Sequence, residues 1–205
     1  MNLALGIVGA LVAFAIGAIP FGLIVSRIFF KRDIRTEGSG NIGAANALRT
    51  LGKRGAAAVL VLDALKGALP VLAVALVTGS AAWAALAGAG AVLGHCYSPF
   101  LGGKGGKGVA TNYGVVWALA WPAGATFTIL WIATLIATGF SSVASIVATV
   151  AMPFALWFVI GWPGLAYGIA AAILVVYAHR ENLARLRAGT ENALPLFGVR
   201  EKAKP

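Results

Sequence analysis

The chain has few charged side chains and almost no cysteine. Its 205 residues include one cysteine, two histidines and six acidic residues, whereas 60% of the residues are hydrophobic. The single cysteine, Cys96, excludes an internal disulfide and a cysteine-based metal cluster. A soluble domain of this length does not need so many apolar residues, but a protein that crosses a membrane several times does. We therefore expect an all-α polytopic membrane protein that uses no metal and no cofactor.

Positive charge is spread unevenly along the chain. Apart from Lys66, the Lys and Arg residues fall in three clusters, at residues 27–54, at Lys104 with Lys107, and at residues 180–204. Loops rich in Lys and Arg stay on the cytoplasmic side of a membrane. The remaining connections between apolar stretches hold no charge, at residues 78–81, 121–123 and 160–164. The net charge of +10 is therefore attributed to membrane orientation, and we expect a lipid bilayer as partner and no nucleic acid.

The apolar stretches are residues 3–30, 55–78, 81–93 and beyond, 109–138, 142–160 and 164–178. Crossing ~30 Å of hydrocarbon takes ~20 helical residues. The stretch 109–138 is either one long helix or a hairpin broken at Trp121-Pro122-Ala123-Gly124. A single crossing would put the C-terminal basic cluster outside, against the charge rule, so the hairpin is favoured. The sequence thus predicts one domain, residues 1–205, with seven transmembrane helices, two of them short, the N-terminus outside and the C-terminus cytoplasmic.

The first polar loop carries glycines in the spacing Gly38-x-Gly40-x-x-Gly43. This spacing indicates a dinucleotide site only between a strand and a helix of a βαβ unit. Here it lies between apolar helices, so a dinucleotide site is rejected. The loop still holds polar side chains that suit an anionic, hydroxylated ligand: Ser39, Asn41, Asn46 and Arg49. The alternative interpretation is a flexible connector.

A second loop combines glycines and lysines between residues 102 and 108. It is not a Walker A loop, because Lys107 is followed by Gly108 instead of Ser or Thr and the spacing is one residue short. Glycines let successive backbone N–H groups converge on one anion, and a helix that begins near Val109 adds its N-terminus. We therefore predict a phosphate site formed by Gly102, Gly103, Lys104, Gly105, Gly106 and Lys107.

Further polar residues lie at or within the apolar stretches. The hydroxyl groups around Ser142 are interpreted first as helix N-caps. His179 and Asn182 are one helical turn apart at the end of the last apolar stretch, where they could face the loops. Asp63 and Lys66 lie within an apolar stretch, and ionisable residues at such depth are functional candidates by default. An ion pair that lines a polar cavity is the favoured interpretation of these two.

Taken together, these motifs resemble those of a known family. The segment from Gly38 to Asn46, the run Gly-Gly-Lys-Gly-Gly-Lys-Gly-Val-Ala-Thr that starts at Gly102, and His-Arg-Glu-Asn-Leu from His179 are similar to the bacterial acyl-phosphate:glycerol-3-phosphate acyltransferases of the PlsY type. The resemblance implies a seven-helix protein of the bacterial inner membrane with its active site facing the cytoplasm. It also implies transfer of an acyl chain from acyl phosphate, made by a soluble phosphate acyltransferase, to the 1-hydroxyl of glycerol 3-phosphate. The products are lysophosphatidic acid and phosphate, in the first acylation step of bacterial phospholipid synthesis.

The resemblance also implies roles for individual positions. The catalytic residues it implies are His95, Lys104, Ser142 and His179. The substrate-binding residues it implies are Ser39, Asn41, Asn46, Arg49, Gly102, Gly103, Gly105, Gly106, Lys107, Thr111, Asn182 and Glu191. Three positions depart from the family pattern: Ala45 replaces a frequent Thr, Gly103 replaces a usual aromatic residue, and no basic residue precedes Phe140.

During the reaction the hydroxyl group of glycerol 3-phosphate must lose its proton. Three groups are candidates to accept that proton: His95, His179 and a phosphate oxygen of the acyl donor. Position 100 is Phe, so His95 lacks the acid found in the soluble acyltransferases with a His-x-x-x-x-Asp motif. The donor phosphate is therefore favoured. A phosphate transporter is the rival function, because it too would need polar loops beside a membrane cavity and the intramembrane pair of Asp63 and Lys66.

Overall fold

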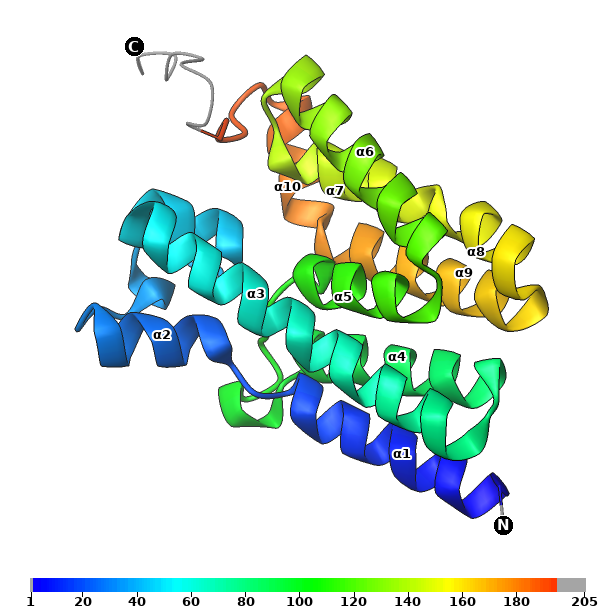
Figure 1. Ribbon diagram of the computed structural model, residues 1–205. Coiled ribbons are helices and arrows are strands. Elements are labelled where there is room, and N and C mark those ends of the chain that lie inside the picture. Colours follow the sequence, from blue (N-terminus) through cyan, green and yellow to red (C-terminus); the bar gives the residue numbers. More distant parts are fainter. Residues whose placement is uncertain (1, 195–205) are drawn as a thin grey trace.

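The computed structural model describes residues 2–194, and every regular element in that range is helical (Figure 1). The basic residues near the C-terminal end, at positions 200–204, lie outside the described range. Two 3₁₀ turns lie in loops, η1 (Ile34–Thr36) and η2 (Pro99–Leu101). The α-helices are α1 (Asn2–Gly17), α2 (Phe21–Phe29), α3 (Ala44–Thr78), α4 (Ala81–Cys96), α5 (Val109–Leu119), α6 (Trp121–Thr138), α7 (Ser141–Val150), α8 (Met152–Ile160), α9 (Trp162–Ala178) and α10 (Arg180–Arg187).

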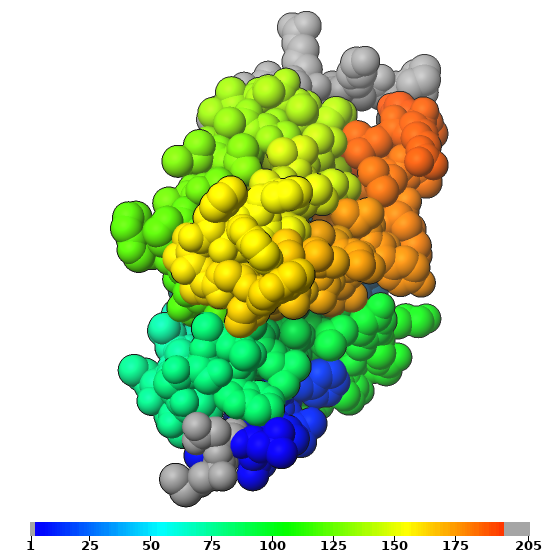
Figure 2. Space-filling view, turned by 90° about the vertical axis from the view of Figure 1, so that its right-hand side faces the viewer, coloured from blue at the N-terminus to red at the C-terminus, as the bar shows by residue number. Residues whose placement is uncertain are grey.

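Two groups of helices lie on either side of α5 (Figure 1). In one group α1 packs on α4 and α2 packs on α3, and in the other α6 packs on α7 and α8 packs on α9. Figure 2 shows α8 and α9, in yellow and orange, stacked above α4 in green and α1 in blue. Buried side chains from both groups form a shared core that includes Val71, Val92, Val115, Phe127 and Leu156.

Proline marks the breaks between successive helices. Pro20 separates α1 from α2, and Pro122 and Pro153 lie in the first turns of α6 and α8. Proline has no N–H group, so it fits the first turn of a helix better than its interior, where Pro70 of α3 is an exception. The predicted break in the stretch 109–138 is confirmed, because Ala120 between α5 and α6 is extended, with φ −160° and ψ 106°.

Five helical segments within residues 2–194 are long and apolar enough to cross a membrane, and the bent pair α9–α10 raises the number to six. The five are Leu3–Phe29, Ala44–Thr78, Ala81–Leu101, Trp121–Thr138 and Ser141–Ile160. Helix α5 has 11 residues, fewer than the ~20 that a full crossing needs. The all-helical membrane class is thus confirmed, whereas the count of seven spans and the orientation of the termini stay predictions.

A glycine bends α3 near its start. Gly52 has φ 76° and ψ −172°, a conformation outside the helical region that residues with a Cβ atom rarely adopt. The bend separates the first turns of α3, which carry Asn46 and Arg49, from the long apolar part that carries Asp63. The first turns, with Asn46 and Arg49, can therefore point in a different direction from the long part of α3.

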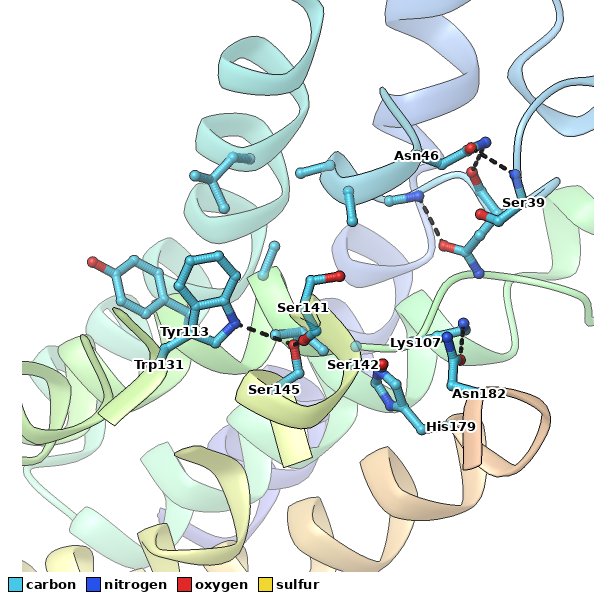
Figure 3. A pocket seen from close by; sticks show the side chains of 18 of the residues that line it. Ser39, Asn46, Lys107, Tyr113, Trp131, Ser141, Ser142, Ser145, His179 and Asn182 are labelled. Atoms are coloured by element: carbon cyan, nitrogen blue, oxygen red, sulfur yellow. Dashed lines mark hydrogen bonds between the residues drawn. The ribbon is translucent and has the colours of Figure 1, made fainter. Parts of the chain in front are cut away.

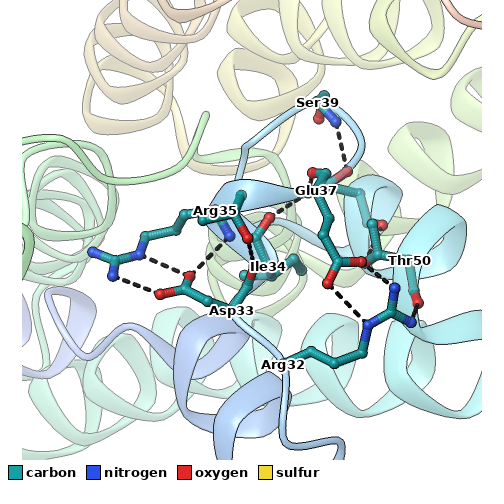
Figure 4. A network of polar contacts seen from close by, with 9 residues as sticks. Arg32, Asp33, Ile34, Arg35, Glu37, Ser39 and Thr50 are labelled. Carbon is teal, nitrogen blue, oxygen red and sulfur yellow. Dashed lines mark hydrogen bonds and ion pairs between the residues drawn. The ribbon is translucent and has the colours of Figure 1, made fainter.

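Ion pairs fix the loop that precedes α3 (Figure 4). Arg32 pairs with the Glu37 carboxylate and also donates to the carbonyl oxygen of Thr50 at 2.5 Å. Asp33 accepts from Arg35 at 2.7 Å, and this hydrogen bonding holds the pKa of Asp33 well below its usual range. Exposed ion pairs contribute little to stability individually. Their effect here is to hold the path of the loop against α3.

Helices α3 and α5 approach each other through glycine. A Cβ atom on Gly114 would overlap the carbonyl oxygen of Ala64, and one on Gly67 would overlap that of Thr111. In lipid, helices associate mainly by packing, and small residues let their backbones come close. This contact fixes α5 against the helix that carries Asp63.

Replacing Gly114 by Ala should lower the melting temperature of the protein in detergent. The added methyl group meets the backbone of α3, and overpacking of this kind costs about 1–3 kcal/mol. The matched control is Ala133→Val, which adds bulk at an exposed position of α6 and should leave the melting temperature unchanged. Equal melting temperatures for Gly114→Ala and the wild type would contradict the close packing of α3 on α5.

Candidate active site

A cavity of about 320 Å³ lies where the polar loops meet the ends of the helices (Figure 3). Its polar rim comes from four separate stretches of the chain and includes Ser39, Asn41, Asn46, Arg49, Lys107, Ser142, His179, Asn182 and Glu191. Its apolar part comes from α3, α5 and α6 and includes Leu60, Val109, Tyr113, Phe127, Trp131 and Ile132. The nine rim residues are all among the predicted site residues, and His95 lines the cavity as well.

Asn46 holds the first loop in place. Its Nδ2 donates to the carbonyl oxygens of Ile34 at 3.0 Å and Asn41 at 2.8 Å, and its Oδ1 accepts from the N–H of Ser39 at 2.8 Å. Asn41 in turn accepts from the N–H of Gly43 at 2.9 Å. The Asn46 side chain is buried and both of its donor hydrogens have partners in the loop. Its contact with substrate stays a prediction.

Arg49 reaches the cavity and has a buried donor without a partner among residues 2–194. Its Nη2 donates to the carbonyl oxygen of Asn192 at 3.1 Å. Its Nε is buried and has no hydrogen-bond partner among residues 2–194. A buried donor without a partner is unfavourable, and an anion in the cavity would satisfy it. Arg49 is thus arranged to bind a negatively charged group.

The carboxylate of Glu191 joins three side chains at the rim. Its Oε1 accepts from the Ser142 hydroxyl at 2.9 Å and from Asn182 Nδ2 at 2.5 Å, and its Oε2 accepts from Arg185 Nε at 2.7 Å. The side chain is only 4% exposed. Burial raises the pKa of Glu191, but hydrogen bonds from Asn182, Arg185 and Ser142 outweigh burial and lower it below its ordinary value. The charged carboxylate therefore orients both Ser142 and Asn182.

Lys107 enters the cavity beside Asn182. Its ammonium group donates to Asn182 Oδ1, so Lys107 is linked to Glu191 through the Asn182 amide. Burial, followed by the charge of Arg185, lowers the pKa of Lys107. Figure 3 shows Lys107, Asn182 and His179 together at one side of the cavity.

The backbone of the glycine loop is arranged differently from the prediction. The N–H groups of residues 102–106 all donate to carbonyl oxygens of the chain, among them Gly105 to Cys96 and Gly106 to His95, both at 3.0 Å. Left-handed glycines in this loop let it fold back onto the end of α4. In this arrangement these N–H groups are bonded within the chain, and the loop contributes the Lys107 side chain to the cavity. Five loop residues do not line the cavity: Gly102, Gly103, Lys104, Gly105 and Gly106.

Lys104 is exposed on this loop. Its catalytic role stays a prediction, as do the substrate contacts of the four glycines around it. Thr111 is also outside the cavity lining. It is buried in α5, and its hydroxyl has no hydrogen-bond partner in the described part of the chain. Its substrate contact therefore stays a prediction too.

His95 is buried beside Asp63. The His95 Nδ1 atom lies 3.7 Å from the Asp63 carboxylate, which forms an ion pair with Lys66 at 2.7 Å. The predicted ion pair of Asp63 and Lys66 is confirmed, and Asp63 also lines the cavity. Asp63 of α3 brings a carboxylate near His95, but at a distance too long for a hydrogen bond, and His95 Nδ1 has no hydrogen-bond partner among residues 2–194. Sequence spacing could not reveal this approach, because the two residues lie on different helices.

His179 ends α9 with a fixed ring orientation. Its Nδ1 lies 2.8 Å from the carbonyl oxygen of Val175, so Nδ1 carries a hydrogen atom and donates. In the neutral ring Nε2 is then the acceptor. His179 lines the cavity, and its Nε2 atom can accept a hydrogen bond there.

Sequence reasoning missed several lining residues. They are Tyr113, Trp131, Ser141, Ser145, Arg185 and Asn192. Arg185 belongs to a basic flank that membrane orientation already explains, and aromatic residues in apolar helices are usually packing residues. Only the three-dimensional arrangement identifies them as part of the cavity.

Known proteins match this chain along most of its length. A sequence profile described as glycerol-3-phosphate acyltransferase matches residues 7–189. A protein of that name from Brucella anthropi is 44% identical over 198 residues, which cover 96% of this chain and 97% of the relative. Another from Rhodopseudomonas palustris is 45% identical over 195 residues, covering 95% and 98%. The chain belongs to the glycerol-3-phosphate acyltransferase family.

Two solved structures of this acyltransferase family share the fold. The crystal structure of PlsY (YgiH), an integral membrane glycerol 3-phosphate acyltransferase, in the glycerol 3-phosphate form has a TM-score of 0.86 and 37% identity, covering 92% of this chain and 94% of that chain. The lysophosphatidic acid form has a TM-score of 0.83 and 36% identity with the same coverage. The family membership predicted from the motifs is confirmed.

Replacing Glu191 by Gln should lower the melting temperature near neutral pH, and the difference should shrink in acid. The folded-state pKa of Glu191 is lowered from 4.5, so its charge stabilises the fold above that pH and the contribution is lost as pH falls through the lowered pKa. Melting temperatures of both proteins from about pH 7 to about pH 3 test this. Glu181→Gln, at an exposed position, is the matched control. A difference independent of pH would contradict the role of the charge.

Proposed function

We propose that this protein transfers the acyl chain of an acyl phosphate to the 1-hydroxyl of glycerol 3-phosphate. The glycerol oxygen forms a bond to the acyl carbonyl carbon, the bond from that carbon to the donor phosphate breaks, and the hydroxyl proton goes to the departing phosphate. The products are lysophosphatidic acid and phosphate. The protein would act in the bacterial inner membrane with the cavity facing the cytoplasm, where a soluble phosphate acyltransferase supplies the donor.

The two-part cavity is the observation that supports this proposal. Arg49, Lys107 and Arg185 bring positive charge to the rim, and aromatic and aliphatic side chains form the other part. Both substrates carry phosphate, but only the donor carries a long hydrocarbon chain. A cationic rim beside an apolar, membrane-embedded part therefore suits both substrates at once. The relatives' names supply the acceptor, glycerol 3-phosphate.

The rim residues divide between the two substrates. Arg49, through its free Nε, is assigned to the phosphate of glycerol 3-phosphate. Ser142 donates its hydroxyl hydrogen to Glu191, so its oxygen can accept from a hydroxyl of the acceptor. Lys107 is assigned to the donor phosphate, whose charge it neutralises on departure. Because acyl phosphate is already activated, orientation and charge stabilisation are the main contributions required of the protein.

Replacing Lys107 by Met should lower acyl transfer by about 10²–10³-fold, the usual loss when one charge-stabilising donor is removed. The measurement is release of lysophosphatidic acid by purified protein in detergent from acyl phosphate and glycerol 3-phosphate. Lys53→Met removes an exposed charge outside the cavity and is the matched control. Lys104→Ala tests the other lysine of the loop in the same assay. Full activity of Lys107→Met would contradict the assignment of the donor phosphate.

The donor phosphate is proposed as the proton acceptor. His95→Gln and His179→Gln should then each cost less than about tenfold, whereas removal of a general base costs ~10²–10⁴-fold. Melting temperatures of the two variants control for damage to the fold. A loss of a hundredfold or more in one variant, together with a changed pH profile, would assign the base to that histidine.

A phosphate transporter is the alternative function, favoured by the buried ion pair of Asp63 and Lys66. The detergent assay separates the two functions. An enzyme releases lysophosphatidic acid without a sealed compartment, whereas transport is detectable only in sealed vesicles.

A further inference from the structure

Trp131 lies at the boundary between the polar and apolar parts of the cavity. It follows Phe127 by one turn of α6, and both residues line the cavity. The indole Nε1–H donates to the hydroxyl oxygen of Ser145 at 3.2 Å, and the Ser145 hydroxyl donates to the carbonyl oxygen of Ser141 at 2.6 Å (Figure 3). The orientation of the indole is therefore set by α7, the helix that begins at the rim.

The place of Ser145 on α7 sets the depth of the indole. Ser145 follows Ser141 and Ser142 by about one helical turn, which advances ~5.4 Å. Ser142 is at the rim, next to Glu191. An acyl carbonyl held at the level of Ser142 and Lys107 therefore brings the first few carbon atoms of its chain to the level of Trp131.

Beyond the indole, the cavity is closed by rings on one side and reaches the lipid-facing surface on another. The rings of Tyr113 and Phe127 pack with their centres 5.6 Å apart. Leu60 on α3 and Ile132 on α6 also line the cavity, yet they are 44% and 47% exposed. The remainder of a bound chain can therefore leave the cavity past Leu60 and Ile132 into lipid.

From this arrangement we propose that Trp131 determines donor specificity by admitting straight acyl chains and excluding chains branched near the carbonyl carbon. The inference rests on the proposed use of acyl phosphate. A methyl branch on the third carbon meets an indole that cannot move aside without losing its hydrogen bond to Ser145. A branch at the far end of the chain lies in lipid and meets no such obstacle. One extra methyl or methylene group in an apolar pocket changes discrimination by about 10–200-fold.

Three donors test the proposal: a straight-chain acyl phosphate, a 3-methyl-branched one, and one branched next to its terminal carbon. For each variant, kcat/KM for a branched donor is divided by kcat/KM for the straight donor, so the fraction of folded protein cancels. Trp131→Ala should raise the ratio for the 3-methyl donor at least about tenfold and leave the ratio for the terminally branched donor unchanged. Trp131→Phe and Ser145→Ala should each raise the first ratio by less.

Trp121→Ala is the matched control, because Trp121 begins α6, is 70% exposed and lies outside the cavity lining. Its ratios should equal those of the wild type. A 3-methyl ratio that stays within twofold in Trp131→Ala, or rises equally in Trp121→Ala, overturns the proposal. A wild type that uses none of the donors overturns the proposed function and this inference with it. A wild type that uses the straight and 3-methyl donors equally well overturns only the inference.

Discussion

The buried carboxylate of Glu191 organises the rim of the cavity. It accepts hydrogen bonds from α7 and α10, and through Asn182 it reaches Lys107 on the glycine loop. The residues that follow it are also tied down: the carbonyl oxygen of Asn192 accepts from Arg49 at 3.1 Å, and Leu194 donates to Gly139 at 2.9 Å. One charged carboxylate thus aligns donors that come from distant parts of the chain. Without it, these donors would lose the acceptor that they share.

Within the apolar helices, side chains likewise satisfy backbone groups that lack a partner in their own helix. The break between α1 and α2 frees the carbonyl oxygens of Ala18 and Ile19, which accept from Ser98 at 2.6 Å and from Lys66 at 2.7 Å. Backbone groups at membrane depth must find partners inside the protein. Lys66 therefore has a structural task besides its ion pair with Asp63, and this task accounts for a buried lysine without a transport pathway.

Local patterns in the sequence predicted the helical class, the break next to Pro122 and the polar stretches that supply the rim. Each of these depends on hydropathy or on a residue's own backbone preference. The hydrogen bonds of the glycine loop could not be predicted, because its N–H groups donate to carbonyl oxygens such as those of His95 and Cys96, at the end of a preceding helix onto which the loop folds back. The approach of Asp63 to His95 and the position of Trp131 were missed for a related reason. The spacing of residues along the chain does not show which helices pack together. The number of crossings stays open because α5 is too short to decide it by length.

Leu60 and Ile132 line the cavity and yet face outward. Under the proposed reaction, the hydrocarbon chain of the donor can slide in sideways and the product can slide out by the same route. Neither amphiphile has to be lifted through water, where its tail would be strongly disfavoured. The supply of donor and the removal of product then depend on two-dimensional diffusion, so crowding and fluidity of the bilayer become kinetic variables of the enzyme.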